Sequence, residues 1–340
     1  FLPNYQKLRK TWLERNYPNM KMGEMADKVL EFNQNVSMAV RGVSGLGDEV
    51  DAAADLWRAE AKYFVGEAKA SKMRGTAELE HADDYVPRII EDNRWDAMRL
   101  KIGDEGLIEL LKEAIRRAQP DIADDLLQTI SEGYVNGVNK RIQMNLFERS
   151  QTRLMGLYED TLEDIRLGLI ERYGDDGVDD IMAQIEEALP NSVKAKSKGI
   201  PRTRQRVELD EMASITMPDG TVVRFTDILN NDIENLHQMY TYQMGGGISL
   251  ARNGIEREGM ESFDSILDRL QGEVATNADD AAAKAKEIEA LRFMYDGVTG
   301  RLAHSSQVSE GVERNLRRIR EFNFIRIMGA SGIPTMVEAA

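Results

Sequence analysis

Residues 217–254, MPDGTVVRFTDILNNDIENLHQMYTYQMGGGISLARNG, decide the fold, because only here does the residue pattern change from helix to strand. Two short runs, 214–217 and 221–225, are rich in β-branched residues, and Pro-Asp-Gly lies between them. Such runs around an Asp-Gly turn are typical of a β-hairpin. We therefore expect one small β-hairpin insertion near residues 207–226, with Asp219 and Gly220 at its turn.

A helix is expected to follow the hairpin directly. Thr226 or Asp227 would cap its start. Its apolar residues recur at three- and four-residue spacing: Leu229, Ile233, Leu236 and Tyr240. The three glycines 245–247 are expected to end this helix, because glycine is a common helix terminator. The hairpin and these glycines would then form a joint between two helical halves of the chain.

Helical patterns fill most of the remaining sequence. The clearest begins at Asp48, where apolar residues fall at spacings of 4, 3, 4, 3 and 4: Val50, Ala54, Trp57, Ala61, Phe64 and Ala68. This is the stripe of a helix packed lengthwise on another helix. A further helix is expected at 103–119, where one face carries Leu107, Leu110, Leu111, Ala114 and Ile115, and Pro120 is expected to break it. Other helices are expected at 122–134, 144–173, 176–189, 256–270, 281–295 and 306–327. Pro87 instead predicts an extended connector at 81–95.

These patterns predict an all-α fold of extended multi-helix bundles, with the hairpin as a small insertion. The expected organisation is an N-terminal helical segment with its connector (1–100), a helical bundle ending in a basic loop (101–206), a hairpin-and-helix joint (207–254) and a C-terminal helical segment (255–340). The sequence starts at Phe1 rather than Met and stops within an apolar segment. We therefore expect it to be part of a longer polypeptide.

Composition narrows the function classes. A formal net charge of −15 argues against a protein that coats duplex DNA by neutralising its phosphates. The absence of cysteine excludes disulfides and thiolate metal sites. No uninterrupted apolar run is long enough to span a bilayer, and no signal peptide is recognisable.

One basic stretch stands out in this acidic chain. Residues 191–206 contain six cationic residues and no acidic one, namely Lys194, Lys196, Lys198, Arg202, Arg204 and Arg206. Gly199 and Pro201 predict a loop here. The stretch is either a solvated loop or a contact for phosphate, lipid headgroups or nucleic acid.

No catalytic, cofactor or metal site is predicted. The three histidines, His81, His237 and His304, have no metal-ligand spacing. Adjacent acidic pairs such as Asp83-Asp84 and Asp179-Asp180 diverge by about 100° on a helix, so they are expected to face solvent. The glycines 245–247 lack the pattern of a phosphate-binding loop, and residues 329–332 do not form a nucleophile elbow.

Three phrases are similar to segments of one protein family. The first is the Asp-Gly hairpin followed by Ile-Leu-Asn-Asn-Asp (228–232), Tyr240 and Ser-Leu-Ala-Arg (249–252). The second is Asp-Tyr-Val-Pro-Arg (84–88) with Trp95, and the third is Asn-Phe-Ile-Arg-Ile-Met (323–328). In this order they resemble the large internal virion proteins, or ejection proteins, of short-tailed bacteriophages.

The resemblance implies a helical structural protein that is packaged inside the capsid, leaves through the tail and forms part of a DNA conduit through the host envelope. Its implied partners are other ejection proteins, portal and tail components, further copies of itself, and double-stranded DNA that passes without sequence recognition. Host envelope contact would lie outside this segment. Some family members carry a lytic transglycosylase domain, but its catalytic glutamate context is missing here, so no enzyme activity is expected of this segment.

Two alternatives stay open. The chain could be a non-catalytic region flanking an enzyme domain of a giant virion protein, such as a head-packaged RNA polymerase or a peptidoglycan transglycosylase. It could also be a host-type helical adaptor, which would have a complete reading frame close to this length.

Overall fold

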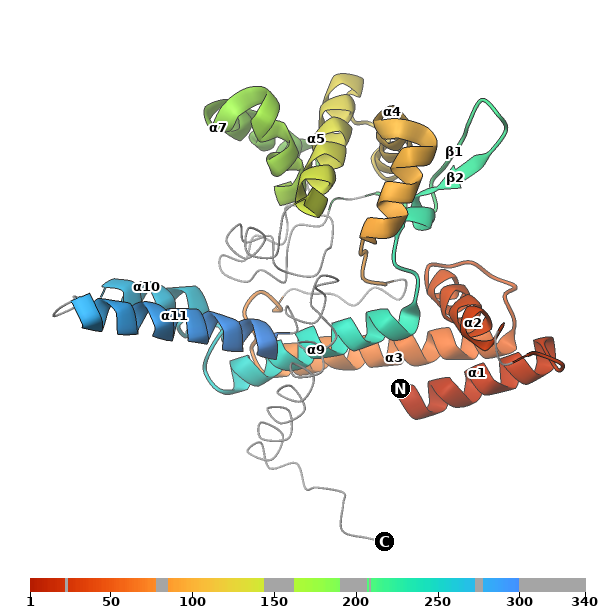
Figure 1. The fold of residues 1–340 in the computed structure, drawn as a ribbon, viewed down its shortest axis with the longest axis horizontal. Coiled ribbons are helices and arrows are strands. Elements are labelled where there is room, and N and C mark those ends of the chain that lie inside the picture. The colour runs from red at the N-terminus through yellow and green to blue at the C-terminus, as the bar shows by residue number, and fades with distance from the viewer. Residues whose placement is uncertain are drawn as a thin grey trace, which may run out of the picture. The chain divides into compact units, whose positions relative to one another are not determined.

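The structure is a computed structural model that describes residues 1–21, 24–77, 85–143, 162–189, 207, 209–272 and 278–299. Within these residues it is mostly helical, with one two-stranded antiparallel sheet (Figure 1). The elements are α1 Leu2–Asn16, α2 Met25–Val40, α3 Asp48–Ala70, α4 Asp92–Ala118, α5 Asp124–Gln143, α7 Leu162–Ala188, β1 Ser214–Thr216, β2 Val222–Arg224, the 3-10 helix η2 Phe225–Ile228, α9 Ile233–Arg252, α10 Phe263–Gly272 and α11 Ala278–Val298. The predicted all-α fold with one small hairpin is confirmed.

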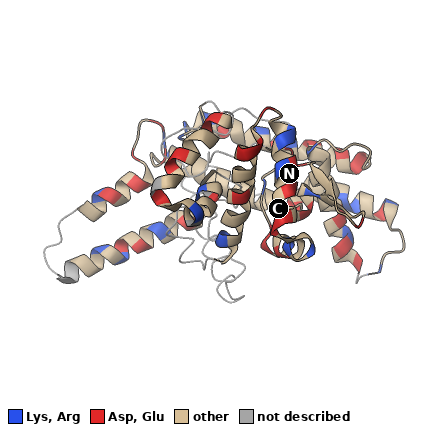
Figure 2. Cartoon of the chain, turned by 90° about the horizontal axis from the view of Figure 1, so that it is seen from above, with Lys and Arg blue, Asp and Glu red and all other residues tan. Residues whose placement is uncertain are grey.

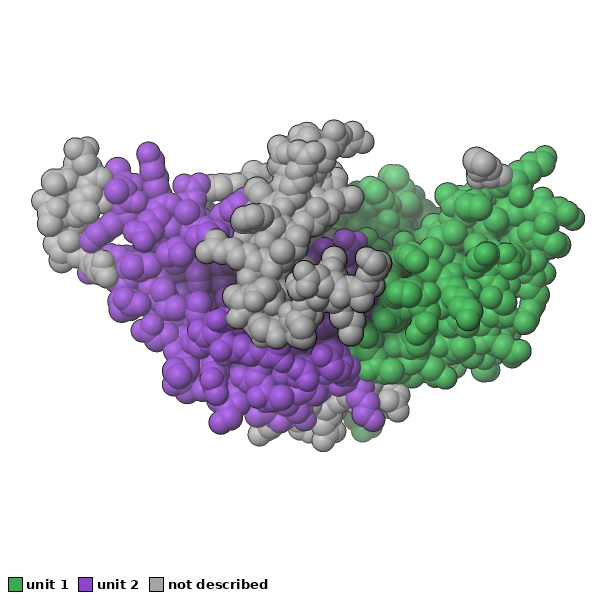
Figure 3. All heavy atoms as spheres, turned by 90° about the horizontal axis from the view of Figure 1, so that it is seen from below, with its two compact units in different colours: residues 1–61, 81–236 green, residues 62–80, 237–340 purple. Residues whose placement is uncertain are grey.

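The chain divides into two compact units (Figure 3). The first unit comprises residues 1–61 and 81–236, and the second comprises residues 62–80 and 237–340. Each unit is therefore built from two separate stretches of sequence. Of the described helices, α3 and α9 contribute residues to both units.

The hairpin forms as expected. Ile215 pairs with Val223 in an antiparallel register, and the Gly220 N–H donates to the Met217 carbonyl at 2.8 Å. Gly220 has a φ of +84°, which glycine adopts without steric cost. Asp219 accepts a hydrogen bond from a backbone N–H in this turn, and that bond lowers the pKa of its carboxyl group.

The core of the first unit lies among α4, α5, α7 and the hairpin, and Figure 1 shows the three helices side by side. The apolar stripe predicted for α4 is buried here. Of the apolar residues that follow the Pro120 break, Leu127, Ile130 and Tyr134 are buried, whereas Ile122 and Leu126 are partly buried. The largest buried side chains of this core include Trp95, Tyr134, Phe225, Leu107, Leu110, Leu111, Ile115 and Leu127. Helical periodicity therefore identified the main core correctly.

Glycines allow α5 and α7 to approach closely. A Cβ atom at Gly137 would lie 1.8 Å from the carbonyl oxygen of Asp164, and one at Gly168 would lie 1.9 Å from that of Gly133. Real Cβ atoms do not come this near to backbone, so larger residues would force the helices apart. A buried ion pair also joins α5 to α7, with Arg141 Nη1 at 2.8 Å from both carboxylate oxygens of Asp164.

The α3 stripe is also confirmed, since all six of its predicted residues are buried. Gly174 interrupts α7 with a non-helical backbone, as expected from its position between two helical patterns. Within the part of the chain that the structure describes, no helix combines the length and the apolar character needed to cross a membrane.

The predicted start of the helix after the hairpin is wrong. Residues 225–228 form the short η2 turn, in which Asp227 accepts from the Arg224 N–H at 2.9 Å. Leu229 is extended and pairs with Ile90. Helix α9 starts only at Ile233, where Asp232 Oδ1 accepts from the N–H groups of residues 234 and 235. Asp232 is therefore the N-cap of α9. The helix does not start earlier because Leu229 is extended and forms a β-bridge with Ile90.

The predicted helix end at the three glycines is also wrong, because α9 continues through 245–247 to Arg252. A Cβ atom at Gly246 would lie 2.1 Å from the carbonyl oxygen of Val298, at the end of α11. Glycine is needed here for close packing of backbone on backbone within the second unit. Tertiary contact thus outweighs the weak helix propensity of glycine.

Two further boundaries differ from the expectation. The described residues 85–91 of the connector lie outside helices and include the β-bridge of Ile90 with Leu229, but α4 starts at Asp92, so Trp95 is helical. Helix α4 kinks at Gly103, the residue where a helix start was predicted. The next residue, Asp104, accepts from Arg99 Nε at 2.6 Å, and this guanidinium lowers the pKa of the Asp104 carboxyl group.

In the second unit, α10 starts at Phe263 rather than near Glu256. Ser262 Oγ accepts from the Ser265 N–H at 3.0 Å and caps this helix. Glu256 lies in the preceding loop with a φ of +58°. The predicted amphipathic pattern began seven positions early because the loop residues happen to match the helical period.

Candidate functional site: a buried arginine–glutamate junction

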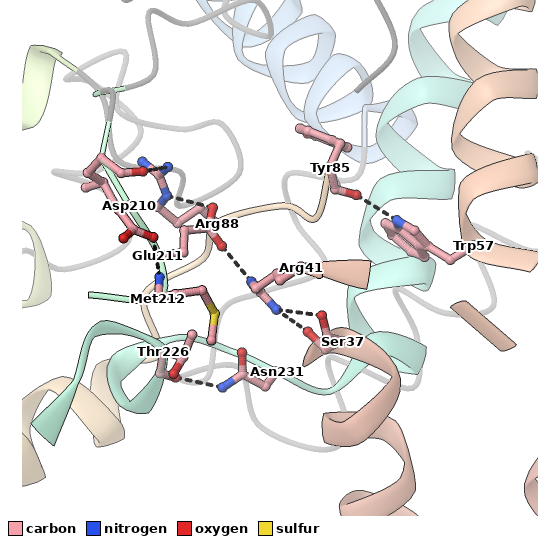
Figure 4. Close-up of polar contacts among 11 residues, drawn as sticks. Ser37, Arg41, Trp57, Tyr85, Arg88, Asp210, Glu211, Met212, Thr226 and Asn231 are labelled. Carbon is pink, nitrogen blue, oxygen red and sulfur yellow. Dashed lines mark hydrogen bonds and ion pairs between the residues drawn. The ribbon is translucent and has the colours of Figure 1, made fainter. Parts of the chain in front are cut away.

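The six cationic residues predicted as an anion contact, Lys194, Lys196, Lys198, Arg202, Arg204 and Arg206, lie outside the described residues. The described chain resumes at Val207, next to that stretch. Val207 and residues 209–212 enter a polar junction of the first unit that the sequence did not predict. This arginine–glutamate junction, defined by Arg41, Arg88 and Glu211, is the candidate site of the structure (Figure 4).

The connector places Arg88. Pro87 favours an extended backbone at the preceding residue, and Val86, Ile89 and Ile90 are buried. Trp57 Nε1 donates to the Tyr85 carbonyl at 2.8 Å, which fixes the connector on α3. The side chain of Arg88 is therefore held in the interior, where it is only 6% exposed.

Arg88 binds the segment 207–212 at three points. Its Nη1 donates to the Val207 carbonyl at 2.7 Å, and its Nη2 lies 3.5 Å from the Leu209 carbonyl. Its Nε donates to Glu211 Oε1 at 3.1 Å. A planar guanidinium with several donors suits such a multiple contact, and a lysine could not reproduce it.

Arg41 approaches the same carboxylate from a different side (Figure 4). It lies at the C-terminal end of α2, where a cation also interacts favourably with the helix dipole. Its Nε donates to Glu211 Oε2 at 2.5 Å, and its Nη1 also contacts the carbonyl and hydroxyl of Ser37. Each oxygen of Glu211 thus receives a hydrogen bond from one arginine.

Backbone contacts extend the junction to residues 228–232. The Asn230 N–H donates to the Ile89 carbonyl at 2.8 Å, and the Glu91 N–H donates to the Ile228 carbonyl at 3.1 Å. Asn231 Nδ2 donates to the Thr226 carbonyl at 2.7 Å. The junction therefore joins α2, the connector, the segment before β1 and the segment before α9.

In this arrangement the charged side chains hold separate segments of the chain together. Both oxygens of Glu211 accept hydrogen bonds from guanidinium groups, and arginine does not release its proton in proteins. The three side chains are 3%, 6% and 16% exposed, so each charge depends on its partners for compensation. Among the described residues no group of three or more His, Cys, Asp or Glu side chains is placed to hold a metal ion.

The second unit has a polar contact of its own around Glu256. Glu256 Oε1 accepts from the Phe263 N–H at 3.1 Å and from the Tyr295 hydroxyl at 3.2 Å. The Arg74 N–H donates to the Glu256 carbonyl at 2.9 Å. Lys72 and Glu256 both have positive φ, at 55° and 58°. Two turns with left-handed residues are thus hydrogen-bonded to each other inside this unit.

Sequence reasoning identified only one member of the first junction. Arg88 belongs to the phrase Tyr-Val-Pro-Arg, which the sequence singles out, but Arg41 and Glu211 have no sequence signal. Arg41 and Glu211 are 170 positions apart, and Arg88 and Glu211 are 123 positions apart. Neither helical periodicity nor motif spacing reports contacts over such separations.

No protein-family model matches the chain. The chain is similar to Trigger factor of Cutibacterium acnes, with 21% identity over 282 residues that cover 82% of this chain and 47% of that protein. The chain thus spans about half the length of the curated relative it matches.

Proposed function

We propose that this chain is a structural segment of a DNA-ejection protein of a short-tailed bacteriophage. It is packaged in the capsid interior, leaves through the tail and forms part of a conduit through the host cell envelope and periplasm. Its partners are other ejection proteins, portal and tail components and further copies of itself. Double-stranded DNA passes it without sequence recognition.

One observation supports this proposal more than any other. Ile89 and Glu91, which directly follow the phrase Tyr-Val-Pro-Arg, are hydrogen-bonded to Asn230 and Ile228 of the phrase Ile-Leu-Asn-Asn-Asp, so two of the three phrases that resemble the family meet at one junction although they are far apart in sequence. Short phrases that resemble a family by chance have no reason to meet in space. The third phrase, residues 323–328, lies outside the described residues.

Charge supports passage of DNA rather than binding. The chain has a net charge of −15, and Figure 2 shows cationic and acidic residues interspersed along its described helices. An acidic wall repels the DNA backbone at short range, while salt screens the repulsion beyond about 10 Å. The basic residues from Lys194 to Arg206 would provide a local contact to DNA, lipid headgroups or an acidic neighbour.

The buried ion pairs are suited to a chain that must unfold and refold. Charged side chains regain water when a junction opens, whereas exposed apolar surfaces aggregate. Glu211 with its two arginines and Asp164 with Arg141 are such pairs at tertiary contacts. Opening them would leave soluble charged groups during transit through a narrow tail.

Mass spectrometry of purified particles tests the proposal. Peptides of this chain are expected in filled virions of the phage that encodes it and to be depleted from particles that have ejected their DNA. The major capsid protein serves as the internal control, because it stays in both. Absence from filled virions, or equal retention in emptied ones, would refute the proposal.

A further inference from the structure

Helix α11 of the second unit uses one face to pack on α10, which lies beside it (Figure 1). Ile288, Leu291 and Tyr295 follow each other at spacings of 3 and 4 and are partly or fully buried. The Tyr295 ring stacks on Phe263 of α10 with 3.9 Å between ring centroids and an interplanar angle of 6°. This inner face accounts for the intramolecular packing of the helix.

A second stripe lies on the opposite side of the helix. Ala282, Lys286, Glu289 and Phe293 are spaced by 4, 3 and 4 residues, and all four are exposed. At about 100° per residue they form one line roughly opposite the inner face. This outer face has the spacing of a helix packed lengthwise on a neighbour, and Phe293 is 46% exposed on it.

The order of residues on the outer face is self-complementary. Read in either direction along the stripe, an apolar residue is followed by two opposite charges and another apolar residue. Neither Lys286 nor Glu289 forms an ion pair within the part of the chain that the structure describes. The stripe of one copy is therefore complementary to the same stripe of a second copy that runs in the opposite direction.

We propose that two copies of the chain associate through α11, packed antiparallel by this outer face. A two-fold axis midway between residues 287 and 288 places Ala282 against Phe293 of the second copy and Lys286 against its Glu289. Each contact then occurs twice, as an isologous interface requires. A parallel arrangement would place Lys286 against Lys286, so the charges select the antiparallel one.

Charge complementarity identifies a second copy of the chain as the partner on the outer face, whereas exposure alone would not. A second α11 supplies an acid opposite each base and a small residue opposite each phenylalanine ring. The interface is a single helix pair and is smaller than a standard protein interface, so the dimer is expected at high protein concentration. This inference does not depend on the proposed function.

Charge reversal tests the pairing by sedimentation velocity of the whole chain. Lys286→Glu alone and Glu289→Lys alone each create two like-charge pairs and are expected to weaken the dimer by about tenfold or more. An equimolar mixture of these two variants should form a heterodimer, and the double variant Lys286→Glu/Glu289→Lys should dimerise like the unmodified chain. Glu287→Lys is the matched control, because residue 287 lies on another side of the helix and its reversal should leave the dimer unchanged.

Restored association of the mixed single variants and of the double variant distinguishes this interface from a general effect of net charge. Circular dichroism verifies that each variant remains folded. A chain that is monomeric up to its solubility limit would overturn the proposal, and so would a dimer that is insensitive to both single reversals. Failure of the mixed variants to associate would also overturn it. In the first case the outer face would be covered by another segment of the same chain or by a different protein.

Discussion

Glu211→Gln is the sharpest perturbation of the first unit, because it removes one negative charge between two buried arginines without changing the size of the side chain. Glutamine has a single acceptor oxygen and two N–H donors. One of the two guanidinium groups would then face a donor instead of an acceptor. Arg41 and Arg88 are 3% and 6% exposed, so water cannot replace the lost partner freely.

The expected cost follows from burial. Removing one partner of a buried ion pair typically costs 3–5 kcal/mol, and because Glu211 is 16% exposed we expect about 3 kcal/mol. Glu109→Gln is the matched control, since Glu109 pairs with Lys112 on the surface of α4 and is 61% exposed. Its loss should cost about 0.5 kcal/mol or less.

Urea unfolding followed by tryptophan fluorescence measures this difference. The chain has three tryptophans, and Trp12, Trp57 and Trp95 are all buried in the first unit, so the signal reports that unit. Hydrogen exchange should speed up in Glu211→Gln at the Asn230 amide, which bonds to the Ile89 carbonyl of the connector, and at the Asp210 amide, which lies next to Glu211 and bonds to the Ala114 carbonyl of α4. The reasoning is refuted if Glu211→Gln lowers the free energy of unfolding no more than Glu109→Gln does. Arg41→Met combined with Glu211→Gln should cost less than the sum of the two single changes, because the pair is coupled.

Three further outcomes are expected. Gly137→Ala should destabilise the first unit by about 1–3 kcal/mol or more, because its Cβ would meet backbone at 1.8 Å. Gly177→Ala, with only an ordinary contact at 3.5 Å, should be neutral or stabilising in the same urea titration; equal effects would contradict this. Lys72→Gly should raise the free energy of unfolding of the second unit by up to about 1 kcal/mol in calorimetry, since its φ of +55° is strained for lysine, and a decrease would count against that strain. Asp104 has a lowered pKa in the folded chain, so its stabilising contribution is present above the ordinary value of 3.8 and lost as the pH falls toward the lowered pKa. Asp104→Asn should therefore flatten the acid side of the stability profile, and an unchanged profile would contradict the assignment.

The sequence predicted most of what local physics controls. The α3 stripe, the α4 stripe and the break at Pro120 follow from a 3.6-residue period and from the missing N–H of proline, which act within one element. The hairpin follows from Asp-Gly between β-branched runs, which is equally local. These features needed no information about neighbouring elements, and the structure confirms them.

The errors occurred where a distant segment decides the local structure. Leu229 fits a helical stripe, but Ile90 draws it into a bridge, and α9 starts only after Asp232. Gly246 has a poor helix propensity, but Val298 requires a residue without Cβ at that position. The intrinsic preferences of leucine and glycine give the wrong local structure for Leu229 and Gly246, because in each case a contact partner determines the backbone conformation. Those partners lie tens to hundreds of positions away and leave no periodic signal.

The residues of the junction tolerate fewer substitutions than the residues of a helix face do. A helix face can be built from many apolar sequences, so the helices carry little that distinguishes one family from another. A guanidinium that must bind two carbonyls and a carboxylate, next to a proline that fixes its backbone, allows far fewer substitutions. Residues 85–88 and 228–232 are of this second kind, since they hold separate segments in register.

If the chain is an ejection protein, sequence likeness should therefore be concentrated at the junction residues Arg88 and Glu211 and in the turn that ends at Asp232, and be weakest along the exposed faces of the helices. Comparison of further ejection-protein sequences at these positions decides this, and an even spread of likeness along the chain would contradict it.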